Sequence, residues 1–150
     1  MVIKALYHTH SNIRMIQQIK FTLPAMRRGC HLITADILDR LPELPERGLV
    51  NIFVCHTSCG LTVTENSDPD VRSDMAHILD RIVPESHSAY DHSMEGLDDM
   101  PAHAKSSLFG VSLTIPIVDH RLALGTWQGI CLCEFRDYGG PRKFIVTLYA

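Results

Sequence analysis

The segment HSMEGLDDMPAH, at residues 92–103, gathers ionisable side chains suited to a metal site. These side chains are His92, Glu95, Asp98, Asp99 and His103. A neutral imidazole offers a metal ion a nitrogen lone pair, and a carboxylate adds negative charge. His92 and His103 are eleven positions apart, so a turn can bring them together. A solvated acidic loop with surface histidines fits the same spacing, and the spacing alone leaves both interpretations open.

A second polar segment, at residues 55–66, follows a run of apolar residues. His56, Thr57 and Ser58 lie at its start and Asn66 at its end. Hydroxyl groups at a strand end can bind phosphate or hold a substrate. His56 and Ser58 could also serve as base and nucleophile, but no acid that would orient the histidine can be named. A hairpin with Ser and Thr at ordinary β positions is the alternative.

The single tryptophan, Trp127, lies beside Gln128 between two glycines in the segment GTWQG. Its indole could stack on a flat ring, and the Gln128 amide could recognise polar edges of that ring. A buried core or interface aromatic is the alternative, since tryptophan is usually well buried.

The chain has an odd number of cysteines, and no CxxC pair occurs. They are Cys30, Cys55, Cys59, Cys131 and Cys133. No signal peptide is visible at the N-terminus, so we expect free thiols in a reducing cytoplasm. Cys131 and Cys133 are two positions apart in an apolar run and would share one face of a strand. That pair fits either a soft-metal site or ordinary buried cysteines.

Hydrophobic periodicity predicts the elements that position these segments. Strict alternation from Met15 to Leu23 predicts a strand. Thr34 is expected to cap a short helix that extends to Leu41. Further strands are expected at residues 49–55, 61–65, 111–118, 122–127, 129–135 and 142–149. Pro116 within a strand predicts an edge or a bulge.

The clearest helix signal begins at Asp68, a capping residue followed by Pro69 at the first helical position. One apolar stripe runs along this helix, at Val71, Met75, Ile78, Leu79 and Ile82. A shorter helix is expected from Pro101 to Gly110. Strands dominate and do not alternate regularly with helices. We therefore expect one α+β domain over residues 1–150, a mainly antiparallel β-sandwich with a few flanking helices.

Composition excludes several classes of protein. At 150 residues the chain is too short for a (β/α)8 barrel. The net charge of −3 argues against a nucleic-acid binder, and no apolar run is long enough for a membrane span. Ten of the acidic residues lie between Glu65 and Asp99, and an acidic segment with histidines suits a metal better than a polyanion.

Three stretches together resemble the YjbQ family, sometimes labelled secondary thiamine-phosphate synthases. They are HTSCGLTVTENSDPDVRSDM, HSMEGLDDMPAHAKSSLFGVSLTIPI and LGTWQGICLCEF. The residues that fit the family signature are Ser112, Ile115, Ile117, Gly125, Thr126, Trp127, Gln128 and Ile130. The resemblance covers most of the chain from about Arg28. It implies a compact β-rich fold with flanking helices, a homotrimer, sites near subunit boundaries and a metal held by histidines.

Some positions match the family's polar pattern and others depart from it. The matching residues are His56, Asn66, His92, Glu95, Asp98, His103, Trp127 and Gln128. In EFRDYGG, Phe135 and Tyr138 stand where many relatives have histidine, so a site built on those histidines would be incomplete. His120 replaces a turn glycine, and because histidine tolerates positive φ we expect the turn to survive.

These observations support two hypotheses. The first is a metal-dependent enzyme acting on a small phosphorylated or heteroaromatic metabolite, with no nucleic-acid or membrane partner. In it, His56, His92 and His103 hold a divalent metal, zinc or magnesium. The other roles fall to Glu95 and Asp98 in acid–base chemistry, and to Thr57, Ser58, Asn66, Trp127 and Gln128 in substrate binding. The second hypothesis is a non-enzymatic trimer that binds a metal or metabolite. A loop that only stabilises a trimer is a third possibility.

Overall fold

The computed structural model describes residues 16–85 and 90–150. Met15, with which the first predicted strand begins, lies outside the described residues, as does the N-terminal stretch on which the signal-peptide expectation rests. Among the described residues, no helix is long and apolar enough to cross a membrane.

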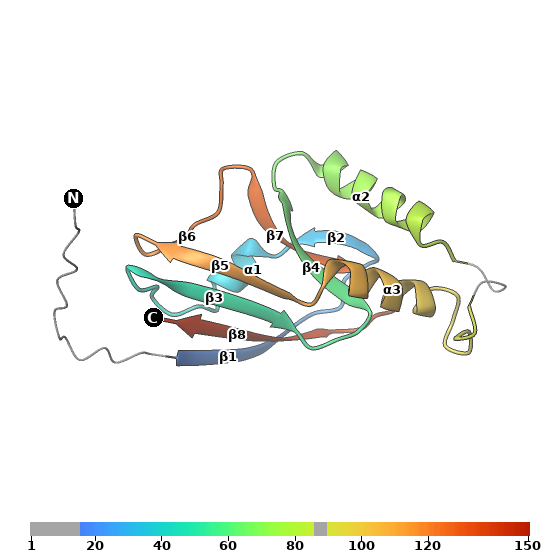
Figure 1. Cartoon of the computed structure of the whole chain (residues 1–150), viewed down its shortest axis with the longest axis horizontal. Helices are drawn as coiled ribbons and strands as arrows, with labels where there is room; N and C mark the ends of the chain where they lie inside the picture. The colour runs from blue at the N-terminus through green and yellow to red at the C-terminus, as the bar shows by residue number, and fades with distance from the viewer. Residues whose placement is uncertain (1–15, 86–89) are drawn as a thin grey trace, which may run out of the picture.

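Two antiparallel sheets form the body of the molecule (Figure 1). The larger sheet contains, in spatial order, β1 (Ile16–Leu23), β8 (Arg142–Tyr149), β3 (Arg47–Val54), β5 (Ser112–Val118) and β6 (Arg121–Leu122). The smaller sheet contains β2 (Gly29–Leu32), β7 (Gln128–Glu134) and β4 (Cys59–Glu65). The predicted α+β class with mainly antiparallel strands is confirmed.

The main core lies between the inner faces of the two sheets. On β3, Val50, Ile52 and Val54 are buried while Leu49 and Phe53 are exposed, as the two-residue period of a strand requires. Strand β7 is buried on both faces, because its inner residues join this core and its outer residues lie under helices. Burying each such aliphatic side chain contributes roughly 1.5–3 kcal/mol.

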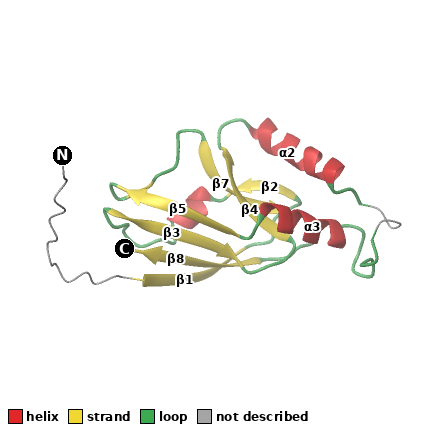
Figure 2. Ribbon diagram, viewed as in Figure 1, coloured by secondary structure: helices red, strands yellow, loops and turns green. Residues whose placement is uncertain are grey.

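Two helices cover the outer face of the smaller sheet. They are α2 (Pro69–Ile82), which contacts β2, and α3 (Asp99–Phe109), which contacts β4 (Figure 2). Asp68 caps α2 as predicted, since its carboxylate accepts a hydrogen bond from the Asp70 N–H at 2.9 Å. Of the predicted apolar stripe only Leu79 is buried, whereas Ile78 and Ile82 are exposed. The helix therefore rests on the sheet over a narrower strip than its periodicity suggests.

The first helix differs from its prediction in both position and length. Thr34 is the first residue of α1 (Thr34–Leu38) rather than its cap. The Thr34 hydroxyl instead accepts a hydrogen bond from the Ile130 N–H at 2.9 Å, so it ties α1 to β7. The helix ends at Leu38, before the expected Leu41.

The structure also tests the predictions for α3, for the strand at residues 122–127, for the turn at His120 and for Pro116. Helix α3 begins at Asp99, two residues before the predicted start. Of the strand expected at residues 122–127, only Leu122 belongs to β6, and the rest is an irregular turn. The turn before β6 survives at His120, with φ of +63°. Pro116 lies on β5, one strand in from the edge strand β6 rather than at the edge itself, and its carbonyl accepts from the Ala123 N–H.

Candidate metal centre

His92, Asp99 and His103 converge at the N-terminal end of α3. One ligand atom from each lies within 4.8 Å of the others. The Asp99 Oδ2 is 2.6 Å from His92 Nε2 and 3.3 Å from His103 Nε2. Asp99 and His103 are one helical turn apart and so share a face of α3, while His92 reaches the same point from the preceding loop. This is a two-histidine, one-carboxylate donor set.

Asp99 is held in place by Arg136, which follows β7. Asp99 is only 1 % exposed, and Arg136 Nη1 donates to Oδ1 of its carboxylate. The same guanidinium donates from Nε to Asp98 Oδ2 at 2.9 Å and from Nη2 to the Glu95 carbonyl at 2.9 Å. Arg136 thus fixes the loop before α3 and occupies one oxygen of Asp99, which leaves Oδ2 facing the two imidazoles.

The hydrogen bonds of His103 indicate what its second nitrogen does. His103 Nδ1 is 2.9 Å from the Thr57 carbonyl oxygen, and since a carbonyl only accepts, Nδ1 carries a proton. In a neutral ring Nε2 then bears a lone pair that faces a carboxylate oxygen, an unfavourable contact that either a cation between them or a proton on Nε2 relieves. Histidines that bind metals commonly donate their other N–H to a backbone carbonyl in this way.

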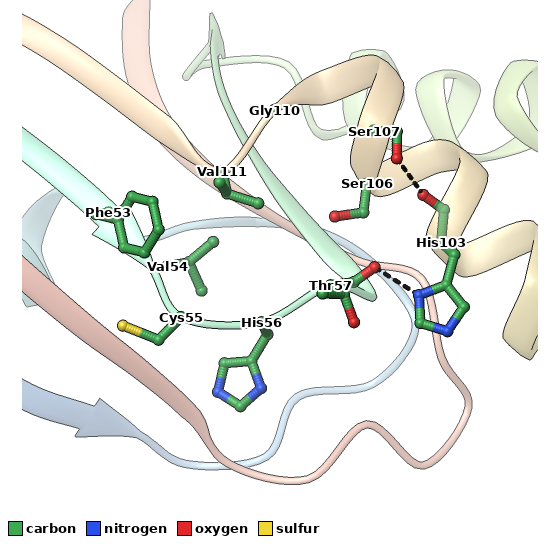
Figure 3. A pocket seen from close by; sticks show the side chains of 10 residues that line it. All are labelled: Phe53, Val54, Cys55, His56, Thr57, His103, Ser106, Ser107, Gly110 and Val111. Atoms are coloured by element: carbon green, nitrogen blue, oxygen red, sulfur yellow. Dashed lines mark hydrogen bonds between the residues drawn. The ribbon is translucent and has the colours of Figure 1, made fainter.

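A groove of about 700 Å³ adjoins this centre. It lies between the end of β3, the C-terminal part of α3 and the chain entering β5 (Figure 3). The residues that line it are Phe53, Val54, Cys55, His56, Thr57, His103, Ser106, Ser107, Gly110 and Val111. His103 belongs to both the groove and the histidine–carboxylate group, so a ligand in the groove would lie beside the metal position.

His56 lines the groove but does not join His92, Asp99 and His103 in their group. Its Nε2 accepts the backbone N–H of Lys143 at 2.9 Å, which occupies the lone pair a metal would need at that atom. Burial lowers the pKa of His56, and the positive charges of Arg142 and Lys143 lower it further. A neutral His56 keeps Nδ1–H as a donor at the groove, which favours ligand binding over metal coordination.

Asp98 and Glu95 lie next to the centre and differ in how they contact Arg136. Burial alone would raise the pKa of Asp98, but hydrogen bonds from the Asp137 N–H and from Arg136 bring it below its usual value. Asp98 is therefore a carboxylate that positions Arg136. Glu95 is exposed, and its backbone carbonyl rather than its carboxylate binds Arg136.

Ser58 is engaged by a buried ion pair. Its hydroxyl accepts from Arg142 Nη2 at 3.2 Å, and Arg142 also pairs with Glu134. Both charged residues are almost completely buried. Thr57 supplies its carbonyl to His103 while its side chain lines the groove. Of the two predicted substrate-binding hydroxyls, Thr57 is thus the better placed for a ligand.

The other predicted substrate residues lie at the far end of the smaller sheet. Asn66 Nδ2 donates to the carbonyls of Thr126 and Gln128, each at 3.1 Å, and Gln128 Oε1 accepts from Gly125 N–H at 2.8 Å. Trp127 is 65 % exposed at the tip of this turn. Along β4 the turn is separated from the histidines by about 20 Å, the length of a seven-residue strand (Figure 1).

The two positions that depart from the resemblance have different surroundings. Phe135 is buried and packs edge-to-face against Phe109, with ring centroids 5.5 Å apart. Tyr138 is almost fully exposed. The Phe135 position thus belongs to the packing beneath the helices, and the histidine–carboxylate group described above is formed without either position.

Sequence reasoning grouped Asp99 with the histidines but did not assign it as a ligand, and it missed the contact of Arg136 with Asp99. The spacing of Asp99 and His103 by four residues was a usable signal, but only for a helix that begins at Asp99. Arg136 lies 37 positions beyond Asp99, in a stretch with no local indication of its partner.

Comparison with known proteins identifies the family. The family described as UPF0047 protein YjbQ-like matches residues 18–150. The UPF0047 protein YjbQ of Salmonella typhimurium is 52 % identical over 136 residues, covering 89 % of this chain and 98 % of that protein. Its counterpart in Escherichia coli O157:H7 is 47 % identical with the same coverage.

Solved structures agree with this assignment. The conserved hypothetical protein TT1486 of Thermus thermophilus is 37 % identical, with a TM-score of 0.75 over 85 % of this chain and 97 % of that chain. A protein of unknown function from Sulfolobus solfataricus P2 shares the fold at 19 % identity, with a TM-score of 0.78 over 91 % of this chain and 99 % of its own. The chain therefore belongs to the YjbQ (UPF0047) family.

Proposed function

We propose that this protein is a metal-dependent enzyme that acts on a small phosphorylated or heteroaromatic metabolite in the groove beside α3. The observation that carries the proposal is that both ring nitrogens of His103 have a polar contact. Its Nδ1 binds the Thr57 carbonyl while its Nε2 faces the Asp99 carboxylate. A divalent cation between His92, Asp99 and His103 would bind both imidazoles and Asp99 Oδ2 at once, in place of the hydrogen bond between His92 Nε2 and Asp99 Oδ2.

The donor set favours zinc over magnesium. Magnesium prefers oxygen ligands in near-octahedral geometry, whereas imidazole nitrogens with one carboxylate are typical of catalytic zinc and of non-haem iron. Three protein ligands leave a position for water or substrate. The side chain of His92 is 46 % exposed, so that position would be open to solvent. A metal there would polarise a phosphoryl or carbonyl oxygen or activate water.

The groove has features that suit an anionic metabolite. Lys143 places positive charge near His56, and a positive field attracts phosphate. The His56 ring and the Thr57 hydroxyl would supply hydrogen bonds. We assign Glu95 the role of general acid or base, since its loop is held against the centre by Arg136 and its exposed carboxylate can exchange protons. A weak thiamine-phosphate synthase activity fits this site better than a dedicated one, because no glycine-rich phosphate loop occurs in the sequence.

We also propose a cytoplasmic homotrimer. Leu49, Phe53 and Tyr149 are exposed on the outer face of the larger sheet, and apolar side chains on such a face commonly mark an interface. Phe53 also lines the groove, so a second chain packed on this face would border the site. The five cysteines are free thiols, which suits a reducing compartment.

Turnover with and without metal tests the enzyme proposal. Metal-stripped protein is assayed against a panel of phosphorylated metabolites, including a thiazole phosphate with a pyrimidine diphosphate, before and after zinc is restored. We expect zinc-dependent product formation in the unmodified chain. Glu95→Gln should keep zinc and fold but lose turnover by about 10²–10⁴-fold. Glu43→Gln, an exposed site far from the groove, is the matched control.

The alternative function is a trimer that binds a metal or metabolite without turnover. The exposed position of Glu95 is the observation in its favour, since a general acid or base is usually held in place. If ligand binding survives in Glu95→Gln with no turnover in either protein, the enzyme proposal fails and the binding function stands.

A further inference from the structure

Three cysteines meet on the outer face of the smaller sheet, away from the histidines. Cys30 of β2 is the direct cross-strand partner of Cys133 of β7. Cys131 lies two residues before Cys133 and so points to the same face. The three Sγ atoms all lie within 4.8 Å of one another, and those of Cys30 and Cys133 are 2.8 Å apart. We refer to these residues as the thiol cluster.

The surroundings of the thiol cluster are apolar on one side and accessible on the other. Cys131 and Cys133 are buried, in a cluster with Leu79 of α2, Ala102 of α3 and Phe135. Cys30 is only partly buried. It lines a cavity of about 340 Å³ between β2 and the start of α2. An ion could therefore reach Cys30 from solvent and be held away from water by the other two sulfurs.

We propose that the thiol cluster is a second metal site, one that binds a single soft monovalent ion of the cuprous type through three thiolates. Thiolate ligands select soft ions such as Cu(I). Metal–sulfur bonds of about 2.3 Å in a trigonal plane place the sulfurs about 4 Å apart. The separation limit of 4.8 Å accommodates this arrangement. Cys30 and Cys133 need to move apart by only about 1 Å.

The number of donors distinguishes this site from a structural zinc site, and the burial of Cys131 and Cys133 distinguishes it from an open zinc site that keeps a bound water. Structural zinc is almost always four-coordinate, whereas the group found among the described residues contains three sulfurs. Cu(I) is stable with three ligands. Nitrogen and oxygen donors at the histidine centre and sulfur donors here give the chain two sites that prefer different ions.

The local charge also favours a cation bound by thiolates. Arg72 lines the same cavity as Cys30. The positive charge of Arg72 remains beside the cluster, where it offsets part of the negative charge that three thiolates leave around a monovalent ion.

An anaerobic competition measurement tests the proposal on the reduced full-length chain. Cu(I) is supplied as its coloured complex with bathocuproine disulfonate, and the loss of colour reports transfer to the protein. We expect one Cu(I) per chain. Cys30→Ser should weaken binding at least about tenfold. The matched control is Cys55→Ser, because Cys55 is exposed and outside the cluster; it should bind as the unmodified chain does.

A second measurement does not depend on how a variant folds. X-ray absorption at the copper edge of the unmodified, copper-loaded chain should show a shell of three sulfur neighbours. The proposal is overturned if the reduced chain removes no Cu(I) from the competitor. It is also overturned if a folded Cys30→Ser protein binds as tightly as the parent or if nitrogen neighbours dominate the shell.

Discussion

Both ends of the smaller sheet carry polar residues that the sequence analysis placed in one site. At one end these side chains converge on a common point, and at the other they bind the backbone of their own turn. At the end near α3, Arg136 binds both Asp98 and Asp99, and the remaining oxygen of Asp99 faces two imidazoles. At the end near Trp127, the amides of Asn66 and Gln128 are bonded to the backbone of their own turn.

Polar composition alone therefore does not show which end of the sheet can bind a ligand. The α3 end is held by contacts from distant parts of the chain and still leaves a carboxylate oxygen and two imidazole nitrogens directed at one point. The Trp127 end satisfies its own polar groups and presents an indole to its surroundings. A ligand that touches both ends must span about 20 Å or meet the Trp127 turn of another copy. The four predictions that follow run from the largest expected effect to the smallest.

Replacing Arg136 should have the largest effect on the free energy of unfolding. Arg136→Met leaves Asp98 and the buried Asp99 without their cation, and breaking a buried pair by removing one partner costs about 3–5 kcal/mol. We expect a comparable loss in the free energy of unfolding, measured in urea, together with loss of bound metal. Arg121→Met, at an exposed position, is the control. A stability loss below about 1 kcal/mol in Arg136→Met would show that the two ends do not differ as described.

The decline of fold stability at low pH should also depend mainly on charged residues near α3, where Asp80 of α2 pairs with Lys105. Although burial raises the pKa of Asp80, its hydrogen bonds to Lys105 and Arg28 bring it below the ordinary 3.8. A carboxylate with a lowered pKa in the folded state stabilises the fold above its ordinary pKa, and that contribution is lost as the pH falls through the lowered value.

Asp80→Asn should therefore destabilise the protein at pH 7 and flatten the decline in stability below about pH 4. The expected loss is about 1–3 kcal/mol, since Lys105 is only 1 % exposed and loses its charged partner. Urea unfolding as a function of pH gives both quantities. Asp74→Asn, at an exposed position on α2, should show the same dependence of stability on pH as the unmodified protein. If stability below about pH 4 declines in Asp80→Asn as steeply as in the unmodified protein, the account is contradicted.

The Trp127 end should respond locally. Gln128→Ala removes the acceptor of the Gly125 N–H, which should cost about 1 kcal/mol and leave the metal content unchanged. Thermal unfolding and metal analysis of the same sample check both statements, with Gln17→Ala, an exposed strand residue, as control. Metal loss in Gln128→Ala would mean that the turn supports the distant centre.

Trp127→Ala should have the smallest effect on the fold. Because the indole is mostly exposed, stability should change by less than about 0.5 kcal/mol and metal content should not change. A loss of turnover in this variant, with Tyr138→Ala as the exposed aromatic control, would indicate that Trp127 serves a site in a neighbouring copy. A loss of stability above about 2 kcal/mol would show that the turn is part of the core.

Features encoded by neighbouring residues were predictable from the sequence. Alternation located β1, and the Asp68–Pro69 pair located the start of α2. The turn at His120 could be expected because histidine tolerates positive φ. In each case the residues that decide the structure lie within a few positions of one another.

Features set by distant contacts could not be predicted. Thr34 resembles a helix cap, but its hydroxyl is used by Ile130, 96 positions away. His56 resembles a ligand until the Lys143 N–H occupies its Nε2. Likewise, the shared polar pattern placed Trp127 with the histidines, although a whole strand separates them.

Metal analysis of protein purified without a tag tests the central claim most directly. The account predicts about one zinc ion per chain in the unmodified protein, lost in His103→Ala and in Asp99→Asn. His77→Ala, at an exposed histidine on α2, should retain it. Zinc that persists in folded His103→Ala protein, or an unmodified chain that takes up no divalent metal when supplied with it, would contradict the account.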